Sequence, residues 1–128
     1  MTSHARGAFD VTVAPLQGDD EYWGGFGRLS IDKTFRGDLD ATSRGQMMAW
    51  RADAAAAYVA LERVTGALHG RAGSFVLMHV GTMGADATTL VVTVAPGSGT
   101  EALTGLAGTM TIHNDAGKHT YELAYTLP

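Results

Sequence analysis

The chain has 128 residues and a mass of 13.4 kDa, so we expect one domain over residues 1–128. Its 45% hydrophobic content is enough for a core and excludes wholesale disorder. The net charge is -4, with 9 Lys and Arg against 13 Asp and Glu, and no basic cluster occurs. This balance argues against nucleic acid or an anionic membrane as partner. The absence of Cys excludes disulfides, thiolate nucleophiles and thiolate metal sites.

The first ten residues contain no apolar run of signal-peptide length, and no segment approaches the length of a membrane span. We therefore expect a cytoplasmic protein with no membrane partner.

Short apolar segments with period-two alternation recur between glycines along the whole chain. Phe9, Val11 and Val13, for example, alternate with Asp10 and Thr12. Such alternation is typical of strands with one buried and one exposed face. The predicted strands cover residues 5–14, 26–36, 38–50, 56–67, 69–80, 87–95, 107–114 and 118–127.

Three segments need separate treatment. Residues 52–60 are rich in Ala and could form a helix, but the apolar run 58–61 that continues into 64–66 favours a strand. Residues 100–106 predict one helical turn, capped by Thr100 and ended by Gly105. The acidic and aromatic segment 19–25 is interpreted as a loop at a barrel mouth.

Eight antiparallel strands in about 120 residues predict a closed barrel or a sandwich. Closure removes the exposed edges that a flat sheet would carry into aggregation. We therefore expect an all-β, eight-stranded, antiparallel closed barrel with at most one short helical turn. An interior of this size holds side chains or one small ligand.

Several blocks of sequence together resemble a known bacterial family. The blocks are 33–39 (KTFRGDL), 62–66 (ERVTG), 69–77 (HGRAGSFVL), His79, 81–83 (GTM) and 118–127 (KHTYELAYTL). In combination they resemble domain of unknown function 3224, a family whose barrel is similar to that of allene oxide cyclase.

A second similarity lies in residues 98–108, which resemble the Gly-Thr-Gly segment of allene oxide cyclase and dirigent barrels. Glu101 stands where those proteins often carry Gly, so this match is partial. The resemblance implies an antiparallel eight-stranded barrel that often forms homo-oligomers. Related barrels fold or cyclise reactive, largely apolar metabolites without a cofactor, but the family itself supplies no reaction.

Three ionisable residues on the expected inner faces indicate that proton transfer could take place inside the barrel. If the face with Ile31 and Phe35 points inward, Lys33 points inward too and needs a partner, for which Glu62 is the natural candidate. His79 shares a face with Phe75 and Leu77. In an apolar cavity the pKa of a carboxyl would rise and that of a Lys would fall, and both directions favour proton transfer. Lys33, Glu62 and His79 are therefore the candidate catalytic residues.

Other side chains on the inner faces are expected to contact a ligand. These candidate ligand-binding residues are Phe35, Tyr58, Phe75, Leu77, Met110, Tyr121 and Tyr125. Each candidate also has a structural interpretation. A Lys–Glu pair on adjacent strands is typical of an external ion pair, and a His or Tyr among apolar residues is typical of hydrogen-bonded packing.

No metal or cofactor is expected, because His4, His69, His113 and His119 lack metal-ligand spacing. Met48 and Trp50 share one side of a strand, where they could form a subunit contact or a soft cavity wall. The leading hypothesis is a barrel that binds a small apolar metabolite and isomerises or cyclises it without a cofactor. The alternatives are a non-catalytic carrier or sensor and an oligomerising structural barrel.

Overall fold

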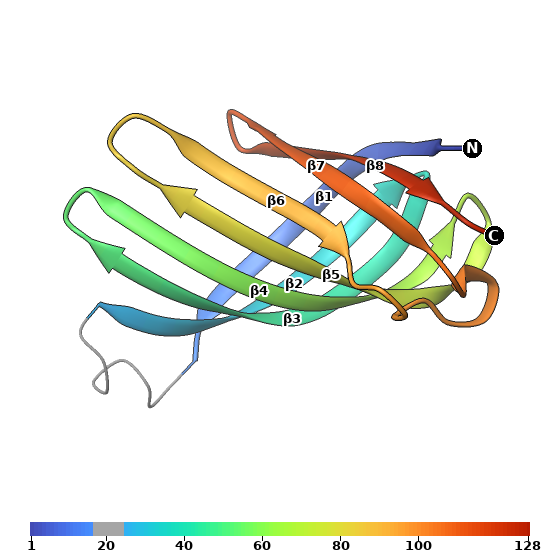
Figure 1. Cartoon of the computed structure of the whole chain (residues 1–128), viewed down its shortest axis with the longest axis horizontal. Helices are drawn as coiled ribbons and strands as arrows, with labels where there is room; N and C mark the ends of the chain where they lie inside the picture. The colour runs from blue at the N-terminus through green and yellow to red at the C-terminus, as the bar shows by residue number, and fades with distance from the viewer. Residues whose placement is uncertain (17–24) are drawn as a thin grey trace.

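The computed structural model describes residues 1–16 and 25–128 and forms a closed antiparallel barrel (Figure 1). Each strand pairs with the next one along the chain, and β8 pairs with β1. The all-β, eight-stranded barrel predicted from the sequence is confirmed. Within the described residues, no helix is long and apolar enough to cross a membrane. The elements are β1 (Ser3–Pro15), β2 (Phe26–Gly37), β3 (Leu39–Ala52), β4 (Ala55–Leu68), β5 (Arg71–Met83), β6 (Thr88–Val94), η1 (Glu101–Leu103), β7 (Ala107–Asp115) and β8 (Lys118–Thr126).

The Ala-rich segment belongs to a hairpin, so its helical alternative is wrong. β3 ends at Ala52, β4 begins at Ala55, and the two strands pair from this turn to the far end of β4. Cross-strand pairing has overridden the helix preference of alanine here. The loop expected at residues 19–25 lies outside the described residues, except for Gly25.

Burial follows the period-two pattern. On β2, Ile31, Lys33 and Phe35 are buried, while the intervening Asp32 and Thr34 are exposed. The same alternation on the other strands builds one core inside the barrel. Its fully buried large side chains are Phe35, Phe75, Leu39, Leu68, Leu77, Leu103, Leu123, Glu62, Val64 and Val92.

One end of the barrel is closed by the segment between β6 and β7. This end carries both chain termini, the β2–β3 and β4–β5 turns and η1 (Figure 1). Leu103 and Leu106 from the connecting segment are 1% and 2% exposed and close the core. Gly105 has a φ of +84°, as expected where the turn ends. Thr100 does not cap the turn: its side chain instead accepts a hydrogen bond from the backbone N–H of Ser74.

The other end carries the β3–β4, β5–β6 and β7–β8 turns (Figure 1). On the inner face of β1, the exposed fraction rises from 3% at Phe9 to 45% at Val13. On the inner face of β6 it rises from 1% at Val92 to 39% at Leu90. Apolar inner-wall surface therefore reaches solvent at this end, and we call this part the open half.

Candidate functional site

The three predicted catalytic residues meet on the inner wall. Lys33 lies on β2, Glu62 on β4 and His79 on β5, and they are only 7%, 1% and 5% exposed. Lys33 Nζ and His79 Nε2 each lie 2.9 Å from Glu62 Oε1. The alternative of an external ion pair between adjacent strands is therefore wrong. The pair lies inside, and β3 runs between its two strands.

Two small residues of β3 allow this pair to form across the strand. Gly45 is opposite Glu62 in the register, and a Cβ at Gly45 would lie 2.7 Å from the Cβ of Glu62. Ser43 is opposite Lys33, and its hydroxyl donates a hydrogen bond of 2.7 Å to Glu62 Oε2. The sequence prediction missed Ser43 as a member of this cluster. Its place on the inward face of the alternating segment 38–50 was the available signal.

Glu62 is the anionic centre of the cluster. Burial alone would raise the pKa of this carboxyl, but the hydrogen bond from His79 and the charge and hydrogen bond of Lys33 outweigh burial. Together they lower the pKa of Glu62 from 4.5 to about 2. The expectation that an inner carboxyl would have a raised pKa is wrong, because it considered burial without the donors. Glu62 is thus ionised at neutral pH and suited to orienting its neighbours.

The ammonium group of Lys33 is also held by aromatic rings. Its Nζ lies 5.1 Å from the ring centroid of Phe9 and 5.7 Å from that of Phe35. Cation–π attraction compensates part of the hydration that a buried ammonium loses. Lys33 is therefore a fixed positive charge beside Glu62.

His79 has one nitrogen available for a ligand. Because ionised Glu62 can only accept, His79 Nε2 must donate to it, and in the neutral ring this leaves Nδ1 unprotonated. Nδ1 has no hydrogen-bond partner among the described residues. In the described part of the chain, no side-chain nitrogen or oxygen that is fully shielded from solvent lacks a hydrogen-bond partner. Because Nδ1 lacks a partner, it is not fully shielded and has some contact with solvent.

Tyr58 lies near His79 on the inner face of the open half. Tyr58 pairs with Gly81 on β5, and a Cβ at Gly81 would lie 2.3 Å from the Tyr58 ring. The ring therefore packs over this glycine, one inner-face position beyond His79. Burial raises the pKa of the Tyr58 phenol. Its hydroxyl has no hydrogen-bond partner among the described residues.

Four other predicted ligand contacts lie within the packed core. Phe35, Phe75 and Leu77 are at most 1% exposed, and Met110 is 3% exposed. Met110 pairs with Val92, which in turn pairs with His79. These residues form the packing around and beneath the cluster.

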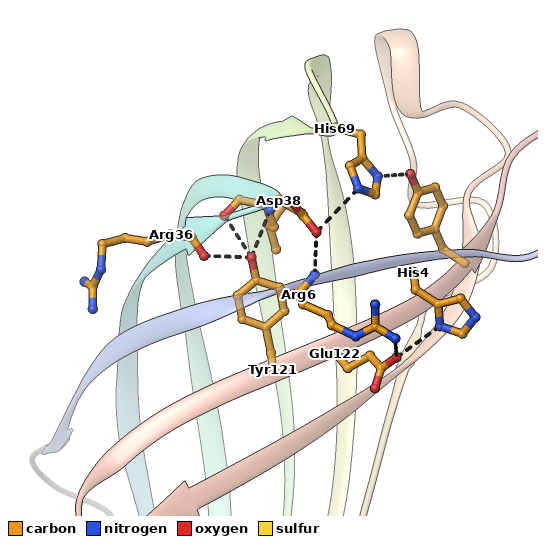
Figure 2. Close-up of polar contacts among 9 residues, drawn as sticks. His4, Arg6, Arg36, Asp38, His69, Tyr121 and Glu122 are labelled. Atoms are coloured by element: carbon orange, nitrogen blue, oxygen red, sulfur yellow. Dashed lines mark hydrogen bonds and ion pairs between the residues drawn. The ribbon is translucent and has the colours of Figure 1, made fainter.

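Tyr121 uses its hydroxyl at the closed end, where Figure 2 shows it beside Arg36. The hydroxyl accepts a hydrogen bond of 2.9 Å from the N–H of Leu39 and donates one of 2.8 Å to the carbonyl of Arg36. The ring passes over Gly7, where a Cβ would lie 2.6 Å from the hydroxyl oxygen. Tyr121 therefore holds the β2–β3 turn against β8.

Tyr125 makes a similar contact at the β4–β5 turn. Its hydroxyl lies 2.5 Å from His69 Nδ1, and His69 Nε2 lies 3.6 Å from a carboxylate oxygen of Asp38 (Figure 2). The same oxygen accepts a hydrogen bond of 2.9 Å from the backbone N–H of Arg6. The structure thus brings Tyr121 and Tyr125 to the closed end, away from Lys33, Glu62 and His79.

No group of three or more metal-ligating side chains occurs within residues 1–16 and 25–128. Among the remaining histidines, His4 contacts Glu122 at 3.1 Å, and His119 stacks on Phe9 with ring centroids 5.1 Å apart.

Comparison with known proteins identifies relatives by sequence and by structure. The family model described as "Protein of unknown function (DUF3224)" matches residues 5–125. The crystal structure of a protein with unknown function from the DUF3224 family of Shewanella oneidensis MR-1 is 41% identical in sequence. The two structures superpose with a TM-score of 0.90, and the match covers 100% of this chain and 99% of that one. No curated protein matches the chain.

Proposed function

The chain belongs to the DUF3224 family, which is described as of unknown function, and we propose that it binds a small, largely apolar carbonyl compound in the open half of the barrel. The observation that carries this proposal is the position of His79. A reachable, unpaired imidazole nitrogen lies in a wall that is otherwise apolar toward the open end. Ligand sites typically combine such apolar lining with a few placed polar groups.

We propose further that His79 transfers a proton on the bound compound. Nδ1 removes a proton from the carbon next to the carbonyl, and the C–H electron pair forms the C=C bond of an enolate. In an unsaturated carbonyl compound this enolate is a dienolate, and return of the proton to its γ carbon moves the C=C bond and completes an isomerisation, with no redox change and no cofactor. An imidazole suits this step because it exchanges protons near neutral pH.

Lys33 and Glu62 have separate roles in this proposal. Lys33 Nζ and His79 Nε2 lie within about 6 Å of each other, because each is 2.9 Å from one oxygen of Glu62. We propose that the positive charge of Lys33 favours the developing enolate through the electrostatic potential of this part of the wall. Glu62 is a positioning residue, because its carboxylate fixes the tautomer of His79 and holds Lys33. Tyr58 lines the entrance.

Solvent-exchange NMR tests the proposal directly. β-Ionone, an apolar unsaturated ketone, serves as the probe in D₂O. Titration is followed by chemical-shift changes of the protein, and proton transfer by deuterium uptake next to the ketone. We expect saturable shifts at Tyr58 and His79 and exchange faster than in buffer.

Variants separate catalysis from binding. His79→Gln is expected still to bind β-ionone through the apolar wall but to lose enzyme-dependent exchange by at least a hundredfold. His113→Gln is the matched control, because His113 is exposed on β7, and this variant should behave as the wild type. Binding without exchange in the wild type would make the protein a carrier or sensor, and absence of binding would refute the site.

A further inference from the structure

The outer face of β3–β6 carries an apolar surface that the interior site does not use. Met48, Val59, Val80 and Val91 are 41%, 54%, 53% and 55% exposed. The register places these four residues in one straight row across the four strands. Leu61, at 58% exposed, begins a neighbouring row. Large aliphatic side chains are thus continuous on a surface that faces water.

This surface, which we call the β3–β6 face, contains three rows of outward positions. The central row is bordered on one side by Trp50, Ala57, Thr82 and Thr89, and on the other by Gln46, Leu61, Met78 and Thr93. None of these positions is charged, although 17% of the chain is Asp, Glu, Lys or Arg. Depletion of charge and enrichment of Met and aromatic residues are typical of the core of a protein–protein interface.

The shape of the β3–β6 face favours a second copy of the same chain. A twisted barrel is narrower in its middle than at its ends, so its outer surface is concave along the barrel axis and convex around it. The concavity is present as an open depression of about 680 Å³, lined in part by Gln46, Met48, Val59, Leu61 and Val80. A saddle of this kind fits an identical saddle turned by about a right angle, the orthogonal arrangement of packed sheets.

The size of the face also fits a dimer. With strands about 4.8 Å apart and rows about 6.8 Å apart, the three rows across β3–β6 cover roughly 400 Å² in projection. Each partner buries ~800 Å² in a typical stable interface, so the contact also takes in the side-chain relief and the rim of the face. The three rows of outward positions carry no charge, and Arg28, which is paired with Met48, borders them on β2 and lines the depression. A two-fold contact requires only that the face is complementary to itself.

We propose that the protein forms a two-fold symmetric dimer of crossed barrels through the β3–β6 face. Val59 and Val80 lie at its centre, near the two-fold axis. The dimer leaves the open end of each barrel and the reachable nitrogen of His79 uncovered, because the β3–β6 face lies on the outside of the wall. The proposal is therefore independent of the function proposed above.

Light scattering coupled to size-exclusion chromatography tests the proposal across micromolar concentrations. We expect the wild type to have twice the 13.4 kDa chain mass and Val80→Lys to have the mass of one chain. Thr12→Lys is the matched control, because Thr12 is an exposed outward position on β1, outside the β3–β6 face, and it should remain dimeric. Leu61→Lys is a second disrupting variant, and circular dichroism of each variant establishes that it is folded.

Cross-linking adds a positional test, because the natural chain has no Cys. Packed sheets lie about 10 Å apart, beyond the reach of a disulfide, so a short bismaleimide reagent is used. Val80→Cys should give a covalent dimer, and Thr12→Cys should not. A monomeric wild type, a mass other than two chains, or a dimer that survives both Lys variants would overturn the proposal.

Discussion

Substitution of Glu62 by Gln tests whether the inner polar cluster is held by one anion. The change keeps the side-chain size but removes the charge and one of two acceptor oxygens. Lys33 and His79 donate to one carboxylate oxygen and Ser43 donates to the other, so the amide NH2 group can keep a hydrogen bond only if the Ser43 hydroxyl turns to accept it. The buried ammonium of Lys33 also loses its counter-charge.

The magnitude follows from burial and from the pKa of Glu62. Removing one partner of a buried ion pair costs about 3–5 kcal/mol, because the remaining charge stays uncompensated. The fall of the Glu62 pKa from 4.5 to about 2 corresponds to about 3 kcal/mol of free energy of unfolding. We therefore expect Glu62→Gln to lose about 3 kcal/mol, a Tm decrease on the order of 10 °C for a domain of this size.

Urea denaturation as a function of pH measures this contribution. Because the pKa of Glu62 is lower in the folded state, its stabilisation is complete above pH 4.5 and is lost as pH falls toward 2. The difference between wild type and Glu62→Gln should therefore be constant near neutral pH and shrink over that interval. The double variant Lys33→Met/Glu62→Gln should be less destabilised than the two single changes added together. A loss under about 1 kcal/mol, or a difference independent of pH, would refute the reasoning.

Three further substitutions test the packing around the site by urea denaturation. Gly45→Ala should destabilise the fold by at least about 1–3 kcal/mol, because the new Cβ would lie 2.2 Å from the carbonyl oxygen of Leu61. Gly27→Ala is the control and should be nearly neutral, because a Cβ there would have nothing within 4 Å. Equal losses of stability in the two variants would contradict this reasoning. Tyr121→Phe should cost about 1–3 kcal/mol by leaving backbone groups at the β2–β3 turn without a partner, and Tyr58→Phe is the control expected to stay within about 0.5 kcal/mol. Leu103→Ala should cost about 2–5 kcal/mol by opening a cavity at the closed end, and a smaller loss would show that the segment does not close the core.

The fold could be predicted because each strand contains its own period-two pattern. Ile31, Lys33 and Phe35 point inward, as their alternation with Asp32 and Thr34 indicates. The β3–β4 hairpin was ambiguous because alanine fits both helix and strand, and only pairing with neighbouring strands decides between them. The role of Thr100 could not be predicted either, since its partner Ser74 lies on a distant strand.

The candidate site was predictable in part of its membership but not in its electrostatics. Alternation indicated inner positions for Lys33 and His79, whereas the apolar neighbours Val59 and Leu61 left the face of Glu62 open, and Ser43 was missed. The pKa of Glu62, however, depends on how many donors reach its two oxygens, and that number is set by the register of four strands. Gly45 permits this arrangement, because any side chain there would collide with Glu62 and would keep the Lys33 side chain from reaching over β3 to the carboxylate. The direction of the pKa shift, and with it the proposal that His79 rather than Glu62 transfers a proton, therefore required the three-dimensional arrangement.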